Sequence, residues 1–534
     1  MLVAIALGLA ACGGSQTVAS SSSAAPRSHA SRAWTNEAGL QHLHFQTAPI
    51  DIRPGQNTIQ NVTIPARDKP AVDGYIVGMR PNLRYLNGKV PPVNILHLHH
   101  GVWLDGTRGP FFFGGEEKTA FHIPRGYGFP YKVSDRWRLN QMIHNLLPNA
   151  TRARLTWDLD FIPATTALAR AVTPVTPIWM DVRSGESYPV FDTLRGTGRP
   201  DGTFTYPTDA KNPYAGRRPM NEVQVPFDGT IVSAVGHLHP GGLHDDIEVV
   251  RPGATLPAKR ACSRVALDIT DSRSATRCAT ATAGSVPHSV RIFRSEAHYY
   301  EPAGPVSWDV SLTASRPDWR VQIHKGETLR ITSTYANRDV SWYENMGIVL
   351  LYVAPKDRTG VDPFAKAVDW KGVLTHGHLP ENDVHGGAAI SGVDARAVAA
   401  GPVAREVRIK NYVYNPGDLS QLGGSGTRVP TIPQGQSLLF VNQDNPRFEW
   451  HSITTCAAPC DRSTGIAYPL ANAPASSQFD SGQLGLDSLP PGATPATNTL
   501  TWKTPSTLRP GTYTYFCRIH PFMRGAFRVI KSIG

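Results

Sequence analysis

The sequence predicts an all-β protein of three domains built from β-sandwiches. Three observations predict it. The chain has 534 residues, and a domain usually holds roughly 150. Its 48 glycines and 45 prolines interrupt it too often for long helices. Short segments with apolar residues at alternate positions, bounded by proline or glycine, recur from about residue 45, as is typical of β-sandwiches.

The amino-terminal segment predicts export. Residues 1–11 are apolar but too short to span a bilayer, and they have the character of the end of a signal peptide. Residues 9–12, Leu-Ala-Ala-Cys, resemble a bacterial lipobox, which implies a lipoprotein signal over 1–12 with Cys12 as the lipidated residue. A Ser/Ala-rich tether follows over 13–34. We expect an exported protein on the outer face of the cytoplasmic membrane, held there by the lipid anchor only. The alternative is an uncleaved apolar stub with a chance cysteine.

The charge pattern argues against nucleic acid as a partner. The net charge of +11 comes mainly from scattered arginines. No compact Lys/Arg run and no nucleic-acid motif occurs. A solvated basic surface near an anionic envelope explains the charge better.

The first predicted domain, 35–215, carries an unusual run of histidines. Alternating segments at 50–52, 57–64 and 75–80 precede the apolar run 93–104, which contains His97, His99 and His100. In an ideal strand His97 and His99 share a face while His100 points away. A bulge or strand end at Gly101 would turn neighbouring side chains together.

A later strand of the same domain, 137–146, carries His144. A single histidine in a strand is more often a satisfied core residue than a metal ligand. The earlier histidine run is what makes His144 a candidate ligand.

The second predicted domain, 216–369, follows a stretch rich in Gly, Pro, Asp and Arg over 193–220. Its first apolar run leads into His237 and His239. Two imidazoles on one face of a strand form a natural chelate for copper or zinc. Met346 opens a later apolar strand, where a methionine is ordinarily part of the core.

A linker over 370–402 separates this domain from the last one. It contains His376, His378 and His385 near two acidic residues. They predict either a further metal site or a polar, glycine-rich connector, and we favour the connector.

The last predicted domain, 403–534, holds the most specific pattern of the chain. Cys517, His520 and Met523 lie on one short loop after an aromatic, alternating strand, and His451 lies earlier in the domain. A cysteine sulfur and two histidine nitrogens in a trigonal plane, with a weak axial methionine, are the ligands of a blue-copper electron-transfer site. The alternative is a buried structural cysteine beside a surface histidine.

This loop, with the sequence Cys-x-x-His-Pro-Phe-Met-Arg-Gly over 517–525, resembles the cupredoxins and is most similar to amicyanin. The resemblance implies a Greek-key β-sandwich and one type 1 copper. The chain departs from compact cupredoxins in the long insertion between His451 and Cys517.

The earlier histidines and methionine resemble, in their order, the ascorbate-dependent type II copper monooxygenases, the family of peptidylglycine α-hydroxylating monooxygenase and dopamine β-monooxygenase. The resemblance covers about residues 45–355 and implies two jelly-roll-like β-sandwich domains with two type 2-like coppers. It implies that one copper supplies electrons and is held by His99, His100 and His144. The other binds dioxygen at the catalytic residues His237, His239 and Met346.

Enzymes of that family use O2 to hydroxylate a C–H bond of an organic substrate, and they need a one-electron donor. For this chain the expected donor is ascorbate or a redox protein. The peptide-amidating members carry an arginine where this chain has Val235, so a peptide substrate is doubtful and the substrate stays unknown. His97 stays open as a ligand of the first copper. The four cysteines outside the copper loop and the lipobox are expected to form two disulfides in an exported protein, Cys262 with Cys278 and Cys456 with Cys460.

The sequence therefore predicts a copper monooxygenase with a fused blue-copper electron-transfer domain. The alternative is a non-catalytic electron-transfer or copper-holding lipoprotein. A laccase or nitrite-reductase relative fits poorly, because Phe516 and Arg518 flank Cys517 where those proteins have an adjacent histidine. The direction of electron flow and the oligomeric state stay open.

Overall fold

The computed structural model describes most of the chain, and the prediction of an all-β fold is confirmed. The described residues are 34, 37–93, 95–115, 117–147, 149–184, 189–193, 196–251, 261–268, 271–279, 289–300, 310–338, 342–376, 393–422, 428–447, 449–456, 458–460, 479–486, 498–520 and 522–531. Within them, the helices are two short 3-10 turns, η1 (Ala66–Asp68) and η2 (Leu168–Ala171). Over these same ranges, no helix has the length and apolarity to cross a membrane.

The first sandwich pairs two sheets, β1-β10-β4-β8-β11 with β2 and β7 attached, and β3-β9-β5-β6. Its strands are β1 (Gln41–Gln46), β2 (Ile50–Ile52), β3 (Asn57–Thr63), β4 (Gly74–Tyr85), β5 (Leu96–Asp105), β6 (Gly109–Gly114), β7 (Phe121–His122), β8 (Tyr127–Tyr131), β9 (Trp137–Asn145), β10 (Thr151–Pro163) and β11 (Thr173–Pro174). Aromatic side chains such as Trp103, Trp137 and Trp157 fill the space between the sheets. Because β5 pairs with β9, the histidines of these two strands lie close together.

The second sandwich is a large sheet, β12-β25-β16-β21-β20-β17-β23-β14, with β15, β22 and β26 attached. Its strands are β12 (Thr176–Asp181), β14 (Thr203–Tyr206), β15 (Glu222–Gln224), β16 (Gly229–Leu238), β17 (Gly242–Val250), β20 (Ser289–Tyr299), β21 (Val310–Ser315), β22 (Val321–Ile323), β23 (Thr328–Ala336), β25 (Gly347–Pro355) and β26 (Gly372–Leu374). Ile231 and Leu351 on one side share a core with Ile247 and Ile331 on the other, so the sheet folds into two layers.

Strands β12 and β14 pair with this second part, although the predicted boundary at residue 215 assigns them to the first domain. Two separate ribbons complete it, β13 (Phe191–Thr193) with β24 (Trp342–Asn345), and β18 (Ala261–Asp268) with β19 (Asp271–Ala279). The backbone register sets Cys262 opposite Cys278 across β18 and β19, and their disulfide stays a prediction.

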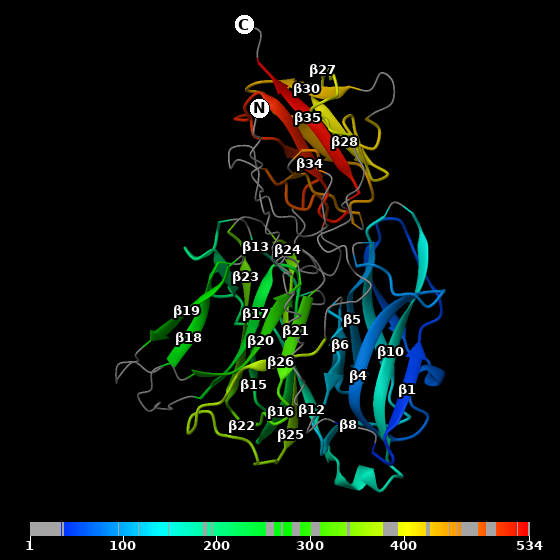
Figure 1. The fold of residues 1–534 in the computed structure, drawn as a ribbon, viewed down its shortest axis with the longest axis vertical. Coiled ribbons are helices and arrows are strands. Elements are labelled where there is room, and N and C mark those ends of the chain that lie inside the picture. The colour runs from blue at the N-terminus through cyan, green and yellow to red at the C-terminus, as the bar shows by residue number, and fades with distance from the viewer. Residues whose placement is uncertain are drawn as a thin grey trace, which may run out of the picture.

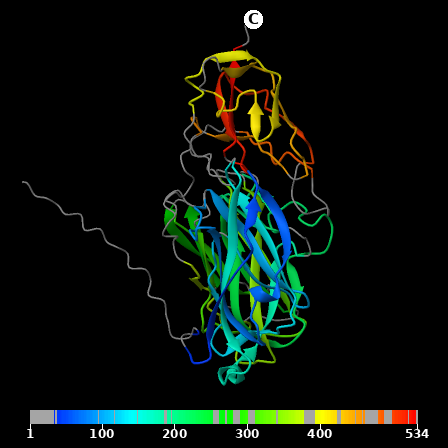
Figure 2. The same ribbon diagram turned by 90° about the vertical axis from the view of Figure 1, so that its right-hand side faces the viewer.

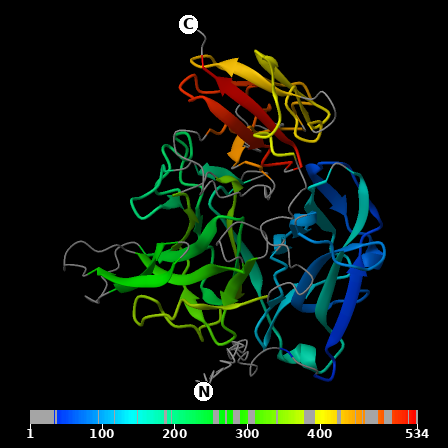
Figure 3. The same cartoon turned by 45° about the horizontal axis from the view of Figure 1, so that its top comes forward.

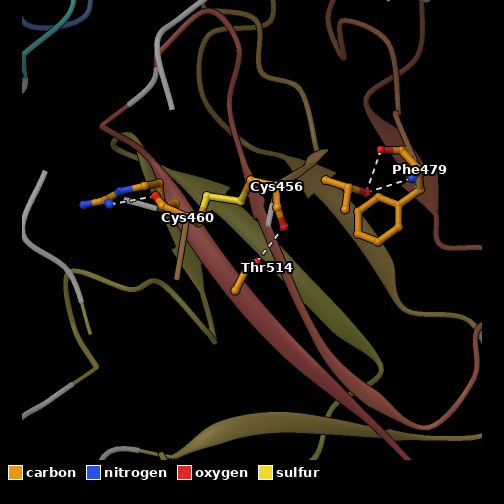
Figure 4. The surroundings of a disulfide bond; sticks show 6 residues. Cys456, Cys460, Phe479 and Thr514 are labelled. Carbon is orange, nitrogen blue, oxygen red and sulfur yellow. Dashed lines mark hydrogen bonds between the residues drawn. A yellow bond between two sulfur atoms is a disulfide. The ribbon is translucent and has the colours of Figure 1, made fainter. Parts of the chain in front are cut away.

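The third sandwich, which its metal-binding loop predicts to be a cupredoxin-like domain, has the sheets β27-β30-β35-β34-β32 and β29-β28-β31-β33. Its strands are β27 (Ala400–Val403), β28 (Glu406–Lys410), β29 (Val413–Asn415), β30 (Val429–Pro433), β31 (Leu439–Asn442), β32 (Thr454–Cys456), β33 (Thr501–Lys503), β34 (Gly511–Phe516) and β35 (Arg524–Ile530). A disulfide joins Cys456 to Cys460 at the end of β32. Beside it, the Thr514 hydroxyl on β34 donates to the Cys456 carbonyl over 2.8 Å (Figure 4).

The first two sandwiches lie side by side, and the third sits across one end of both (Figures 1 and 3). Seen after a turn of 90° about the vertical axis, the third sandwich again lies above the other two (Figure 2). The core of the first sandwich continues into the second through Val235, Ile348 and Tyr352. The Tyr352 ring stacks on Phe121 with centroids 4.9 Å apart. The two sandwiches therefore share apolar packing along β16 and β25, the strands next to the histidines of the second.

Candidate metal centres

The cupredoxin-like loop brings four predicted ligands together. His451 lies just before β32, and Cys517, His520 and Met523 lie between β34 and β35. The Cys517 Sγ lies 4.0 Å from His451 Nδ1 and 3.7 Å from His520 Nδ1, and the two Nδ1 atoms are 3.3 Å apart. In the part of the chain that the structure describes, these three residues form the one His/Cys/Asp/Glu group whose ligand atoms all lie within 4.8 Å. Met523 is buried beside them.

Hydrogen bonds fix which nitrogen of each histidine faces the sulfur. His451 Nε2 donates to the Asp444 carboxylate over 3.0 Å, and His520 Nε2 donates to the Gly55 carbonyl over 2.9 Å. In a neutral ring, a proton on Nε2 leaves the lone pair on Nδ1. The Nδ1 atoms, which face the sulfur, are therefore the ligand atoms once an incoming metal displaces any proton that they carry. The donor set, two imidazole nitrogens, one sulfur and one thioether, is that of a type 1 copper.

The cysteine is prepared to be a thiolate. Burial alone would raise the pKa of Cys517, but the hydrogen bond and charge of His451 hold it below its ordinary value. Burial alone would lower the pKa of His451, but hydrogen bonds to Asp444 and Cys517 raise it to about 9. The Ser452 N–H also points at the sulfur, 3.4 Å away. A thiolate is the form that binds metal.

The copper loop also contacts the first sandwich, a contact that no sequence pattern indicated. His144 Nε2 donates to the Ile519 carbonyl over 2.6 Å, next to the bond from His520 to Gly55. Gly55 has φ +59°, and a Cβ there would lie 2.7 Å from the Tyr412 ring. A side chain at position 55 would therefore push the two sandwiches apart.

Arg518 connects the same loop to the second sandwich. Its guanidinium carbon lies 4.1 Å from the centre of the Tyr343 ring, and its Nη1 lies 3.4 Å from the Asp480 carboxylate. Only 2% of this residue is exposed. A buried guanidinium packed on an aromatic face is stabilised both electrostatically and by contact. The loop that carries Cys517 is thus held by both neighbouring sandwiches.

Asp192 lies close to this junction and gives the protein a pH dependence. Burial raises the pKa of Asp192 to about 8, with the Glu344 charge adding to the rise, while an unfolded aspartate titrates near ~4. The folded chain therefore holds an extra proton between about pH 4 and pH 8, and stability falls as pH rises through this window. Asp192→Asn keeps an acceptor for the Glu344 N–H at 3.2 Å. We expect melting temperatures at pH 5 and pH 8 to differ less in Asp192→Asn than in the wild type, whereas the exposed change Asp318→Asn leaves the difference intact. An unchanged difference in Asp192→Asn would contradict this.

The predicted ligands of the first additional copper lie on β5 and β9. A bulge at His99 interrupts their pairing, since Leu98 faces Ile143 and His100 faces Met142. The sequence placed this irregularity at Gly101. Because of the bulge, His99 and His100 turn their Nδ1 atoms to within 3.4 Å of each other. Neighbouring strand residues normally point to opposite faces.

In two of these ligands, His100 and His144, the Nε2 atom makes a hydrogen bond. His100 Nε2 donates to the Asn140 side-chain oxygen over 2.8 Å, and His144 Nε2 donates to Ile519. Their Nδ1 atoms are left as the ligand atoms, and the Nδ1 atom of His144 has no hydrogen-bond partner among the described residues. Burial lowers the pKa of both residues to about 4. Both rings are therefore neutral at pH 7, the form that binds metal.

His97 keeps its place as an alternative ligand. It faces His144 across the strand pair, with ring centroids 5.1 Å apart. Its Nδ1 donates to the Val93 carbonyl over 2.8 Å, so its Nε2 is the candidate ligand atom. His99, His100 and His144 do not form a group with all ligand atoms within 4.8 Å. The assignment of the first additional copper therefore stays a prediction.

The predicted ligands of the second additional copper lie at the ends of β16 and β25. His237 Nδ1 donates to the Glu117 carboxylate over 2.8 Å, and His239 Nδ1 donates to the Glu344 carbonyl. Both rings therefore present Nε2, and within the described part of the chain His237 Nε2 has no hydrogen-bond partner. Met346 is 2% exposed. Two imidazoles and a soft thioether suit a copper that cycles through Cu(I).

Tyr335 fixes the backbone of this site. Its hydroxyl accepts hydrogen bonds from the His239 N–H at 3.1 Å and the Met346 N–H at 3.2 Å, and it donates to the Met346 carbonyl at 2.6 Å. Neither Tyr335 nor Glu117 was predicted as a residue of this site. Glu117 comes from the first sandwich, 120 residues before His237, so no spacing pattern indicated the pair.

The predicted ligands of the two additional coppers meet at the boundary between the sandwiches. The rings of His99 and His239 have centroids 4.4 Å apart, and those of His237 and His239 are 5.1 Å apart. The buried cluster of ring neighbours consists of His97, His99, His100, His144, His237 and His239. Cys12, His378 and His385 lie outside the described residues, and His376 follows β26, which pairs with β21.

No family model matches the chain, and no curated protein matches it. A purple cupredoxin from Nitrosopumilus maritimus is 18% identical and covers 23% of this chain and 98% of its own, with a TM-score of 0.14. A Cu(I) amicyanin mutant is 19% identical and covers 26% and 92%, with a TM-score of 0.14. A copper-containing nitrite reductase from Thermus scotoductus is 14% identical and covers 58% and 59%, with a TM-score of 0.16.

Proposed function

We propose that this chain is a copper-dependent monooxygenase that hydroxylates a C–H bond with dioxygen and receives electrons through its fused cupredoxin-like domain. The hydrogen bond from His144 to the Ile519 carbonyl supports this proposal most strongly. Ile519 is bonded to His520, a predicted ligand of the type 1 copper, and His144 is a predicted ligand of the next copper. One peptide unit and one 2.6 Å hydrogen bond therefore connect the two sites.

The overall reaction consumes the substrate C–H group, one O2, two electrons and two protons, and yields an alcohol and water. The electrons come from an external one-electron donor such as ascorbate or a redox protein. When bound, copper at these sites supplies one-electron chemistry and a place for O2. A site with three protein ligands leaves a coordination position open.

The chain's own residues orient the second site. Glu117 holds the proton of His237 on Nδ1, and Tyr335 keeps the backbone of His239 next to that of Met346. The proposal also includes the lipid anchor at Cys12, which would keep the enzyme outside the cytoplasm. An exported enzyme cannot use cytoplasmic reductants, so a fused electron-transfer domain suits that location.

This proposal is tested by reducing the protein once and measuring how fast O2 reoxidises it. The copper-loaded chain is reduced without oxygen, mixed with O2 and followed by the return of its blue absorption. We expect His239→Ala to slow this return about tenfold or more, since even an outer partner of a ligand changes metal function by about 10–100-fold. The exposed change His298→Ala should leave the rate unchanged. Equal rates in the wild type and His239→Ala would mean that O2 oxidises the type 1 copper directly.

Glu117→Gln gives a prediction for the second site alone. The amide keeps the size of the carboxylate but holds the His237 proton less strongly. Outer partners of metal-bound histidines typically change affinity by about 10–100-fold, so we expect a loss in that range for the copper at His237. Copper titration under reducing conditions measures it, and Glu296→Gln, at an exposed position, is the matched control. Unchanged affinity in Glu117→Gln would show that the carboxylate does not orient the ligand.

One observation favours the second candidate function, an electron-transfer or copper-holding protein without catalysis. Among the described residues, only the type 1 ligands have His, Cys or carboxylate atoms all within 4.8 Å. This candidate predicts one copper per chain and no oxygen uptake with any reductant.

A further inference from the structure

A cavity of about 350 Å3 lies between the first two sandwiches, and ligands of both additional sites form part of its wall. The wall includes His100 on β5, His237 on β16 and Met346, which directly precedes β25. Its volume falls at the lower end of the ~300–1,000 Å3 range of small-molecule sites. The cavity is therefore suited to a small molecule and too small for a folded peptide segment.

The cavity reaches from the surface to the candidate copper ligands. Asn61 at its wall is exposed, Val102 and Trp179 are half-buried, and His237 and Met346 are buried. A molecule that enters beside Asn61 would thus come to lie against the ligands of the second site. No rearrangement of the sandwiches is needed for this access.

Most of the wall is apolar and partly aromatic. Val102, Phe113, Trp179 and Ile348 line it, and the rings of Phe113 and Trp179 meet edge to face with centroids 5.6 Å apart. Phe113 also lies 5.8 Å from the His237 ring. An aromatic corner beside a metal ligand favours a flat, apolar molecule, because edge-to-face contacts add to the burial of apolar surface.

The polar part of the wall consists of amides and one carboxylate that already has partners. Asn140 accepts the hydrogen bond from His100 and donates to the Asn61 side-chain oxygen over 3.1 Å. Asp181 accepts from the Arg183 N–H over 2.8 Å. In the described part of the chain, no lysine or arginine lines the cavity. Apart from the copper proposed at His237, this lining offers no opposite charge to a carboxylate substrate, which would lose its hydration on entry.

We propose that this cavity is the substrate site and that it takes an uncharged, largely apolar molecule about the size of one substituted ring. Its single polar group hydrogen-bonds to the amide of Asn61 at the mouth, and its apolar end lies against Phe113, Trp179 and the ligands of the second site. This inference rests on the proposed function, because it names the substrate class of that same site.

The test is calorimetric binding of three probes with the same ring to the copper-loaded, oxidised full chain: acetophenone, benzoate and benzylamine. We expect acetophenone to bind once per chain, and benzoate and benzylamine to bind at least about tenfold more weakly. Val102→Trp, which fills the cavity, should weaken acetophenone binding by at least about tenfold. Val373→Trp, at a position that is 42% exposed, should not.

Equal or tighter binding of benzoate or benzylamine would overturn the assignment of an uncharged substrate. Acetophenone binding that is unaffected by Val102→Trp would overturn the cavity as the site. These outcomes do not depend on whether the proposed hydroxylation occurs, because binding is measured without turnover. Probe binding with the expected pattern but without oxygen uptake would keep the cavity assignment and reject hydroxylation.

Discussion

Replacing Met346 with alanine is expected to abolish substrate-dependent oxygen uptake while leaving the blue absorption intact. The thioether of Met346 is the soft ligand proposed for the copper that meets O2, and it lines the substrate cavity. We expect uptake to fall by about 100-fold or more, since the loss of a ligand exceeds the ~10–100-fold effect of an outer partner. Uptake with ascorbate, measured beside the visible spectrum, checks this.

Met220→Ala is the matched control, because it removes a half-buried thioether that packs against the core of the second sandwich. Uptake by Met220→Ala should match the wild type. Wild-type uptake by Met346→Ala would contradict the assignment of Met346 to the oxygen site. Loss of the blue colour in Met346→Ala would show that the change disturbs the cupredoxin-like domain instead.

Replacing Cys517 with serine is expected to remove the blue colour completely and to cut uptake by about 100-fold when a redox protein is the donor. A hydroxyl is not a soft ligand and does not replace the thiolate at a type 1 copper. The two additional sites keep their ligands, so copper per chain should fall by one. Copper content, the visible spectrum and oxygen uptake of the same sample measure all three effects.

A small donor such as ascorbate separates two routes for electrons. If electrons enter only through the type 1 copper, Cys517→Ser is inactive with both donors. If ascorbate also reaches the histidine cluster directly, uptake with ascorbate survives and uptake with the redox protein does not. Wild-type uptake with the redox protein would contradict a role for the cupredoxin-like domain as electron donor.

Sequence reasoning worked best where function is encoded locally. The predicted ligands Cys517, His520 and Met523 share one loop, so their spacing together with His451 predicted a type 1 site, and the structure brings Cys517 Sγ to 3.7 Å from His520 Nδ1. His237 and His239 alternate on one strand, and the structure indeed leaves the same nitrogen of each as the ligand atom. The all-β fold followed from alternation and from frequent glycine and proline, which report local backbone preferences.

Contacts between distant segments were not predictable. The bond from His144 to Ile519 spans 375 residues, and that from His237 to Glu117 spans 120. A sequence pattern reports which face of a strand is apolar, not which surface will cover it. The bulge at His99 was placed two residues away, at Gly101, because glycine is the usual signal for a bulge and His99 carries none. The pairing of β12 and β14 with the second sandwich was missed for the same reason.

The most direct measurement is spin-quantified electron paramagnetic resonance of the oxidised, copper-loaded protein, with total copper counted on the same sample. Our account predicts one type 1 signal and about two type 2 signals per chain, with spins equal to copper unless the close sites are magnetically coupled. Total copper near three with missing type 2 spins would indicate such coupling between the sites that meet at His99 and His239. A lone type 1 signal with one copper per chain would contradict the monooxygenase and leave an electron-transfer protein.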